Sequence, residues 1–245
     1  MKKIIISFVL LSFCFVLSSC KERTLDDIMK DGKIIVATNA EFPPFEYLDG
    51  DTITGFDIDL IKLYAKYLGV DIEINNIDFD GALLSVSSNK ADLVIAGVTK
   101  NEKREQSLSF SNGYFSASQV VIVKKNSNIS GTTIEEIRES LSQNNATIGA
   151  QAGTVGEYYA KGDSDWDFEI IPNTICQTYD NGALAIKALN NGQIDAVIID
   201  KLPAIELTKS YSELQILDTT LTEEEYAIGA VSYTHLRAHE TKANL

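Results

Sequence analysis

Residues 33–47, which read KIIVATNAEFPPFEY, decide the fold of this chain. The first six are a short run rich in β-branched side chains, which is typical of a buried strand, and a loop with two prolines and two phenylalanines follows them. Residues 57–68 then place their apolar side chains largely on one helical face, and Gly69 ends that helix. A strand, a loop and an amphipathic helix in succession form the repeating unit of α/β domains.

The same alternation continues along the chain in two blocks, residues 33–113 and 119–221. These blocks predict an α/β fold with two lobes, each a parallel sheet with helices on both faces. Ligands of such sheets bind beyond the carboxyl ends of the strands, so we expect a site in the cleft between the lobes. Thr132 should cap a helix, because Glu135 lies three residues later. Further strands are expected at 70–74, 91–96, 119–123, 146–150, 168–171 and 194–199, and further helices at 79–86, 132–141, 155–160 and 182–189.

The composition of the 245 residues, 44% hydrophobic and 23% charged, is that of a soluble globular protein. The net charge of −14 repels phosphate backbones, which argues against nucleic-acid binding. Both histidines, His235 and His239, lie close to the C-terminus, and residues 21–230 contain none. This argues against Ser-His-Asp and Cys-His catalysis and against the common zinc sites, so we expect neither a metal nor a cofactor.

Residues 1–20 have the pattern of a bacterial lipoprotein signal peptide. The apolar stretch at 4–17 is shorter than the roughly 20 residues that span a bilayer. Residues 17–20 resemble a lipobox, which implies acylation of Cys20 and a mature protein held outside the cytoplasmic membrane, in a periplasm or on a Gram-positive surface. An ordinary signal peptide is the alternative. We expect residues 21–32 to be a polar tether.

Chemically useful side chains gather at the expected strand ends. Arg104 falls in the opening turns of a helix and could pair with a carboxylate, although a solvated surface arginine is the plainer interpretation. Asp200 ends a hydrophobic strand and could contact an ammonium group or cap the next helix. Together such groups suit the two charged ends of an amino acid. The residues gathered in this way are Asn39, Glu41 and Phe42; Ala96, Gly97, Thr99 and Arg104; Gln151, Gly153 and Thr154; and Asp200.

Several longer stretches carry a family resemblance. They are ATNAEFPPFE at 37–46, GFDIDL at 55–60, AGVT at 96–99 with Arg104 and Phe110-Ser111, QAGT at 151–154 and DAVIID at 195–200. In this order they strongly resemble the solute-binding proteins of polar amino-acid ABC uptake systems. The resemblance covers about residues 33–230. It implies a periplasmic-binding-protein-like fold of type II that captures a polar amino acid and delivers it to permease subunits.

Carried over position by position, the resemblance implies how the ligand is held. Arg104 would bind the α-carboxylate, helped by Thr99 and the backbone at Thr154. Asp200, Gly97 and the Thr99 hydroxyl would hold the α-ammonium group. The acids of the GFDIDL stretch would orient a helix rather than touch the ligand. We expect the protein to be a monomer.

The resemblance also bears on ligand preference. Phe42 and Phe79 would enclose the ligand side chain. Many relatives carry aspartate where this chain has Asn39, and some carry lysine where it has Gln151, while Glu41 adds a carboxylate near the pocket mouth. The absence of that lysine favours a cationic or neutral ligand over glutamate or aspartate. We expect arginine or lysine first and glutamine next, with the identity of the amino acid left open.

Two other functions remain as alternatives. One branch of the family resembles dehydratases that act on prephenate-like acids, so the same scaffold can carry an enzyme. A sensory module that binds a ligand for a larger receptor is the second alternative. The chain has both Arg104 and Asp200, one for each charged end of an amino acid. This favours a binding protein without catalysis.

The C-terminus departs from the family. Residues 224–228 resemble the strand by which the chain returns to the first lobe, and residues 226–230 are expected to belong to that lobe. Residues 231–245 instead resemble a translated transposon-derived sequencing adapter. We therefore expect the natural sequence to differ after about Ala230, with the last part of the first lobe missing.

Overall fold

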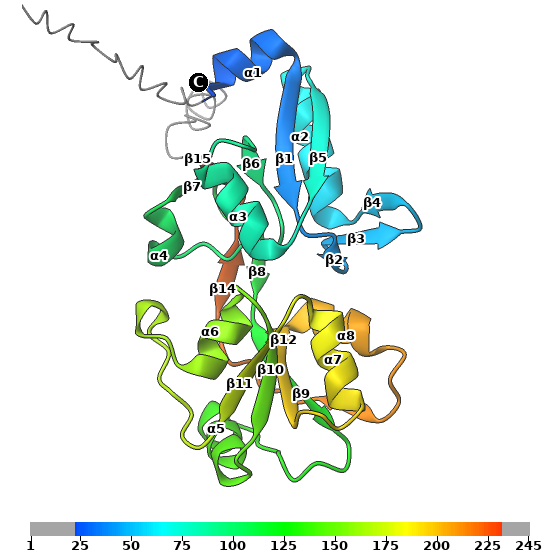
Figure 1. Ribbon diagram of the computed structural model, residues 1–245, viewed down its shortest axis with the longest axis vertical. Coiled ribbons are helices and arrows are strands. Elements are labelled where there is room, and N and C mark those ends of the chain that lie inside the picture. Colours follow the sequence, from blue (N-terminus) through cyan, green and yellow to red (C-terminus); the bar gives the residue numbers. More distant parts are fainter. Residues whose placement is uncertain (1–22, 232–245) are drawn as a thin grey trace, which may run out of the picture.

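The computed structural model describes residues 23–231 and consists of two α/β lobes, one above the other in Figure 1. Each lobe contains a five-stranded sheet, with strand order β5-β1-β6-β15-β7 in the first and β11-β10-β12-β9-β13 in the second. The prediction of a two-lobe α/β fold is confirmed.

The first lobe carries helices on both faces of its sheet. On one face α1 and α2 pack with strand residues such as Ile34 and Val36, and on the other face α3 packs with Ala37 and Val94. Consecutive strand residues therefore serve opposite faces, as the pleat requires. The elements are α1 (Leu25–Asp31), β1 (Lys33–Thr38), α2 (Phe56–Leu68), β5 (Asp71–Asn76), α3 (Phe79–Ser87), β6 (Leu93–Val94), α4 (Glu102–Glu105), β7 (Leu108–Phe110) and β15 (Gly229–Val231). A small sheet of β2 (Glu41–Phe42), β3 (Glu46–Asp49) and β4 (Thr52–Thr54) extends from this lobe.

The second lobe is built in the same way. Helices α5 and α6 cover one face of its sheet, and α7 and α8 cover the other. Its elements are β9 (Gln119–Lys124), α5 (Ile134–Gln143), β10 (Thr147–Gln151), α6 (Val155–Lys161), the 3-10 turn η1 (Ser164–Trp166), β11 (Ile175–Tyr179), α7 (Gly182–Asn190), β12 (Ala196–Asp200), α8 (Lys201–Thr208) and β13 (Leu214–Ile216).

Two paired strands join the lobes. The chain leaves the first lobe along β8 (Phe115–Ala117) and returns along β14 (Glu224–Tyr226), and these strands run antiparallel, with Tyr226 opposite Phe115. Both lie between the two sheets in Figure 1. Tyr226 is fully buried there, and its ring lies 5.1 Å from that of Phe45 and 5.7 Å from that of Phe115.

The prediction that both sheets are parallel is wrong. Strand β15 runs antiparallel to β6 and β7, and β9 runs antiparallel to β12 and β13. Strand β9 follows the crossing strand β8, and β15 follows the returning strand β14. Each therefore enters its sheet from the end that faces the other lobe, and runs opposite to its parallel neighbours.

Two local predictions are also wrong. Residues 168–171 form no strand, and β11 begins at Ile175 instead. Ile171 is buried and packs on the core, whereas β11 is an edge strand with mostly exposed side chains, so hydrophobicity pointed to the wrong segment. Helix α5 is capped by Thr133 rather than Thr132, since the Thr133 hydroxyl accepts a hydrogen bond from Glu136 N at 3.2 Å.

The expected tether contains a helix. Thr24 and Asp27 form a reciprocal capping box at the start of α1. Ile28 on this helix is 1% exposed and packs in the same cluster as Ile34. Ile28 is the buried residue of α1, and Leu25 beside it on the helix is partly buried, so the short helix packs on the sheet through these apolar side chains.

Some predictions fall outside the described residues. The signal peptide at 1–20 with Cys20 and the adapter-like residues after Val231 are among them. Val231, which we assigned to the adapter-like stretch, is the last residue of β15 and lies opposite Leu108. Within residues 23–231, no helix is both long enough and apolar enough to cross a bilayer.

Candidate functional site

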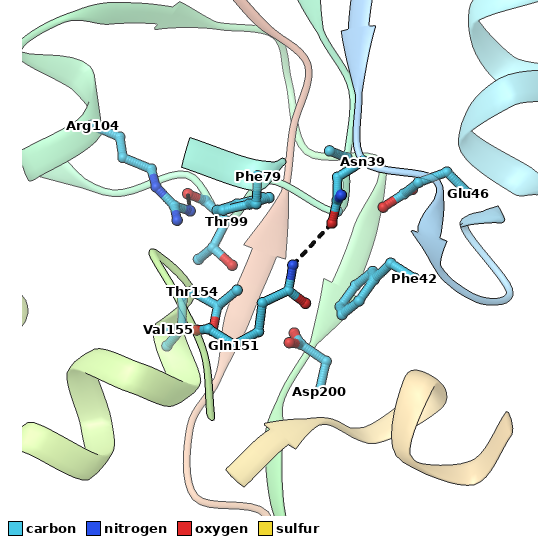
Figure 2. Close-up of a pocket in the computed structure, with 12 residues that line it drawn as sticks. Asn39, Phe42, Glu46, Phe79, Thr99, Arg104, Gln151, Thr154, Val155 and Asp200 are labelled. Carbon is cyan, nitrogen blue, oxygen red and sulfur yellow. Dashed lines mark hydrogen bonds between the residues drawn. The ribbon is translucent and has the colours of Figure 1, made fainter. Parts of the chain in front are cut away.

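A pocket lies between the two lobes, where strands of both sheets end (Figure 2). In the first lobe, Asn39 follows β1, and Ala96, Gly97 and Thr99 follow β6. In the second lobe, Gln151 and Asp200 are the last residues of β10 and β12. This is the location that parallel strand ends create. The pocket is lined by Asn39, Phe42, Glu46, Phe79, Ala96, Gly97, Thr99, Arg104, Gln151, Thr154, Val155 and Asp200.

Ten of the twelve residues that we selected from the sequence line this pocket. Glu41 and Gly153 do not, and the structure adds Glu46 and Val155. Glu41 is exposed because its neighbour Phe42 on β2 is buried, and successive strand side chains point to opposite sides. Gly153 of the second lobe lies against Asp80 of the first, so close that a Cβ atom on Gly153 would fall 1.8 Å from Oδ1 of Asp80.

Arg104 is the one cationic side chain among the described lining residues. It is 8% exposed, and its Nη1 and Nη2 donate hydrogen bonds to the carbonyl oxygens of Thr99 at 2.8 Å and Gly153 at 3.1 Å. Its guanidinium carbon lies 5.3 Å from the centre of the Phe79 ring. Burial lowers the pKa of Arg104 to about 10, which leaves the group charged at neutral pH.

Asp200 supplies a carboxyl group on the second-lobe side of the pocket. It accepts a hydrogen bond from the hydroxyl of Tyr226, on the returning strand β14. Burial and, after it, the charge of Glu224 together raise the pKa of Asp200 to about 7. Asp200 stands at the N-cap position of α8, yet its side chain makes no capping bond. Its carboxyl group is therefore free to face the pocket and the Tyr226 hydroxyl on β14.

Glu46 is the lining residue that sequence reasoning missed. It is fully buried, no N–H or neutral O–H donor of residues 23–231 reaches its carboxyl oxygens, and its carboxyl group lies against that of Asp57, with which it can share a proton. Burial raises its pKa well above the usual range, and the charge of Asp57, a hydrogen bond with the Asp57 carboxyl group and the charge of Asp200 add to this effect. In Figure 2 Glu46 lies on the side of the pocket opposite Arg104, next to Phe42. The sequence offers one indication of this role: Glu46 is an acid that directly follows the loop of prolines and phenylalanines at 42–45.

Asp57, from the GFDIDL stretch, supports the pocket wall from behind. Its Oδ2 accepts hydrogen bonds from the backbone N of Gly97 at 2.9 Å and from the Tyr114 hydroxyl at 2.7 Å. Gly97 has φ +55°, and a Cβ atom there would lie 2.8 Å from Cε1 of Phe42. A glycine is thus required for the close approach of this loop to the aromatic ring.

Besides the bond from Arg104 to the Gly153 carbonyl, a hydrogen bond between two side chains crosses the pocket from lobe to lobe. Gln151 Nε2 of the second lobe donates to Asn39 Oδ1 of the first at 2.9 Å, the dashed line in Figure 2. The Oε1 atom of Gln151 is buried and has no partner. Arg104 and Glu46 lie on opposite sides of the pocket, so its lining suits a molecule that has a carboxylate at one end and a cation at the other, and the cavity of about 10 Å³ must widen to admit it. Within residues 23–231, no three or more His, Cys, Asp and Glu side chains come together in a way that could hold a metal ion.

Comparisons with known proteins agree on one family. Residues 34–185 match the bacterial extracellular solute-binding proteins, family 3. The arginine-binding extracellular protein ArtP of Bacillus subtilis (strain 168) is 28% identical over 235 residues, which are 95% of this chain and 86% of that protein.

Two solved structures are similar in fold and sequence. The Gly52Ala mutant of arginine-bound ArgBP from T. maritima is 32% identical with a TM-score of 0.74, over 85% of this chain and 92% of that one. The ancestral amino-acid-binding protein AncCDT-1, a precursor of cyclohexadienyl dehydratase, is 31% identical with a TM-score of 0.74, over 85% of this chain and 86% of that one.

Proposed function

Because the chain belongs to the bacterial extracellular solute-binding proteins of family 3, we propose that it captures a cationic amino acid outside the cytoplasm and delivers it to an ABC importer. Arginine is the first candidate ligand, lysine the second and glutamine the third. The observation that carries this preference is Glu46, a fully buried acid in the pocket that lies against a second buried acid, Asp57, and with which no cationic side chain of the described residues forms an ion pair. The raised pKa of Glu46 favours its protonated form, which avoids the cost of a buried charge, and a cationic ligand group would replace that proton as the partner of the carboxylate.

The pocket offers a place for each part of such a ligand. The α-carboxylate pairs with Arg104, and the α-ammonium group pairs with Asp200. The aliphatic part of the side chain lies between Phe42 and Phe79, and its cationic end reaches Glu46. Two acids and one arginine then face a ligand with two cationic groups and one carboxylate, so every charge has a partner.

Binding measurements across all twenty amino acids test the proposal. The protein without residues 1–20 should bind arginine and lysine at least about tenfold more tightly than glutamine, since one lost charged contact costs more than 1.4 kcal/mol. Glutamate and aspartate should not bind measurably in isothermal titration calorimetry. Preference for an acidic amino acid would contradict the ligand assignment, and binding of none would contradict the function itself.

An enzyme is the second candidate function. The similarity to AncCDT-1 and the pKa of about 7 at Asp200, a value suited to a general acid or base, both favour it. The pocket nevertheless holds charged groups for both ends of an amino acid, which a prephenate-like acid would leave partly unpaired. A turnover assay with prephenate-like acids separates the candidates, and product formation would favour the enzyme.

The family is extracellular, which places this protein outside the cytoplasm. We propose that Cys20 carries the lipid that holds it to the membrane, that permease subunits are its partners and that it acts as a monomer. Replacing Cys20 with serine should move the protein from the detergent fraction to the aqueous fraction, because buried acyl chains provide the anchoring. A Cys14→Ser variant is the matched control and should stay in the detergent fraction. If the Cys20→Ser protein also stayed there, the lipid anchor would be ruled out.

Ligand affinity should depend on pH. In the ligand-free protein Asp200 has a pKa of about 7, raised by burial, so at lower pH a proton must leave before an ammonium group can bind. The Kd should therefore rise by up to about tenfold for each pH unit below 7, measured by calorimetry between pH 5 and 8. Asp200→Asn should bind weakly with a shallower slope. A flat profile in the parent protein would show that Asp200 does not exchange a proton for the ligand.

The raised pKa of Asp200 also makes the free energy of unfolding depend on pH. Because the pKa of Asp200 is raised above its ordinary value of 3.8, the folded ligand-free protein holds a proton that the unfolded chain has lost between about pH 4 and pH 7. Its contribution to stability is present at low pH and is lost as the pH rises through that window. Ligand should raise the melting temperature more at pH 8 than at pH 5.

A further inference from the structure

Arg104 meets an aromatic ring from the opposite lobe. Its guanidinium carbon lies 5.0 Å from the centre of the Trp166 ring, in addition to its contact with Phe79. Arg104 and Phe79 belong to the first lobe, and Trp166 belongs to η1 in the second. The cation therefore stacks against one ring from each lobe, a contact that exists only when the lobes are together.

A second contact joins the same two segments. Lys103, the neighbour of Arg104 on α4, forms an ion pair with Asp165, the neighbour of Trp166. Both side chains are about half exposed, at 48% and 56%, so this pair contributes little to binding the lobes together. The buried guanidinium against the indole ring is the stronger contact, because cation–π attraction grows when the cation is desolvated.

The turn that presents Trp166 is well defined. Oδ1 of Asp163 accepts a hydrogen bond from Asp165 N at 2.8 Å, and the carbonyl of Asp163 accepts from Trp166 N at 3.1 Å. The Trp166 ring also stacks on Tyr158 of α6, with ring centres 4.8 Å apart and an angle of 18°. Trp166 is therefore held in place before the lobes close.

We propose that Trp166 is a positioning residue of the binding site, a latch on the second lobe that stacks on Arg104 and stabilises the closed form. The proposal rests on the proposed function, since Arg104 is the group assigned to the ligand carboxylate. In the open form the arginine loses the indole ring, and in the closed form it is held by Phe79, Trp166 and two backbone carbonyls. The latch thus slows ligand release without touching the ligand.

Substitution of Trp166 tests the latch through affinity and release rate. Trp166→Leu should raise the Kd for the bound amino acid by about 5- to 30-fold, mainly through faster dissociation in a chase with unlabelled ligand. Trp166→Phe keeps a ring and should restore most of the affinity. Asp165→Asn, which breaks only the exposed ion pair, is the matched control and should stay within about twofold.

Further measurements separate a latch from a merely structural role. The ligand-free melting temperature of Trp166→Leu should stay close to that of the parent, because the latch acts on lobe closure rather than on the fold of the second lobe. The chain contains a single tryptophan, and the latch keeps part of the ligand-free parent closed, so ligand addition should raise the closed fraction and change the emission of Trp166. Affinity and dissociation rate within twofold of the parent in Trp166→Leu would overturn the proposal.

The outcome is distinguishable from failure of the proposed function. If the parent binds no amino acid, the proposed function fails, and the latch is then judged by small-angle scattering of the ligand-free proteins. The parent should be more compact than Trp166→Leu, and equal radii of gyration would overturn the latch on its own.

Discussion

Replacing Arg104 with alanine should weaken amino-acid binding by roughly 30- to several-thousand-fold, the largest effect that we expect of any single substitution. Its guanidinium group is the one cation among the described lining residues, and it would be the partner of the ligand carboxylate. Removing it leaves that carboxylate buried without a counter-charge, which costs about 2–5 kcal/mol. Calorimetry with arginine, lysine and glutamine measures the loss for each ligand.

Two variants control for loss of charge and loss of fold. Lys103→Ala removes a positive charge from the adjacent, exposed position and should leave affinity within about twofold. Arg104→Lys keeps the charge but not the planar fork, so it should recover only part of the affinity. If Arg104→Ala retained affinity within a few-fold while its melting curve remained cooperative, the arginine would not be part of the binding site.

Replacing Glu46 with glutamine should change which amino acid binds. The variant keeps the shape of the buried side chain but removes the charge proposed to meet a ligand cation. We expect arginine and lysine to lose roughly 10- to several-hundred-fold in affinity, and glutamine to change by less than about threefold. Competition titrations with the three amino acids give the ratio directly.

Asp57 provides the matched control for this experiment. It is also buried, and its carboxyl group, close enough to raise the pKa of Glu46, binds the backbone of Gly97 rather than lining the pocket. Asp57→Asn should therefore weaken all ligands to a similar degree. An equal loss for arginine and glutamine in Glu46→Gln would show that Glu46 serves the fold, through Asp57, and not ligand selection.

The sequence predicted an element correctly where the hydrophobic residues that form the pattern also belong to a paired strand or a packed helix. Strand β1 begins at Lys33 and ends at Thr38 as expected, because the run is β-branched and lies in a buried part of the sheet. The segment at 168–171 failed because Ile171 is buried by packing without pairing to another strand. Strand direction could not be predicted either, since it depends on where the chain crosses between the lobes.

The pocket was predictable where residues follow strand ends in recognisable stretches, and less so in the hairpin of β2 and β3. Glu41 and Glu46 both flank the paired prolines, and the sequence drew attention to Glu41. The pairing of Glu46 with Phe42 across that hairpin turns Glu46 inward, while Glu41 pairs with Tyr47 and stays exposed. Which of two nearby acids is buried depends on this register, which no short motif encodes.

The two strands β8 and β14 have a consequence for how the molecule communicates. They form one antiparallel ladder between the lobes, which is the kind of connection about which two domains can close as a hinge. Tyr226 belongs to that ladder and also donates a hydrogen bond to Asp200 in the pocket. Ligand binding would then change the distance between the two lobes, and this distance would be the same whichever amino acid is bound. Under the proposed function, a transport partner that senses only this distance would leave the choice of ligand to the pocket, and a change at Glu46 would alter which amino acid is bound without altering the distance.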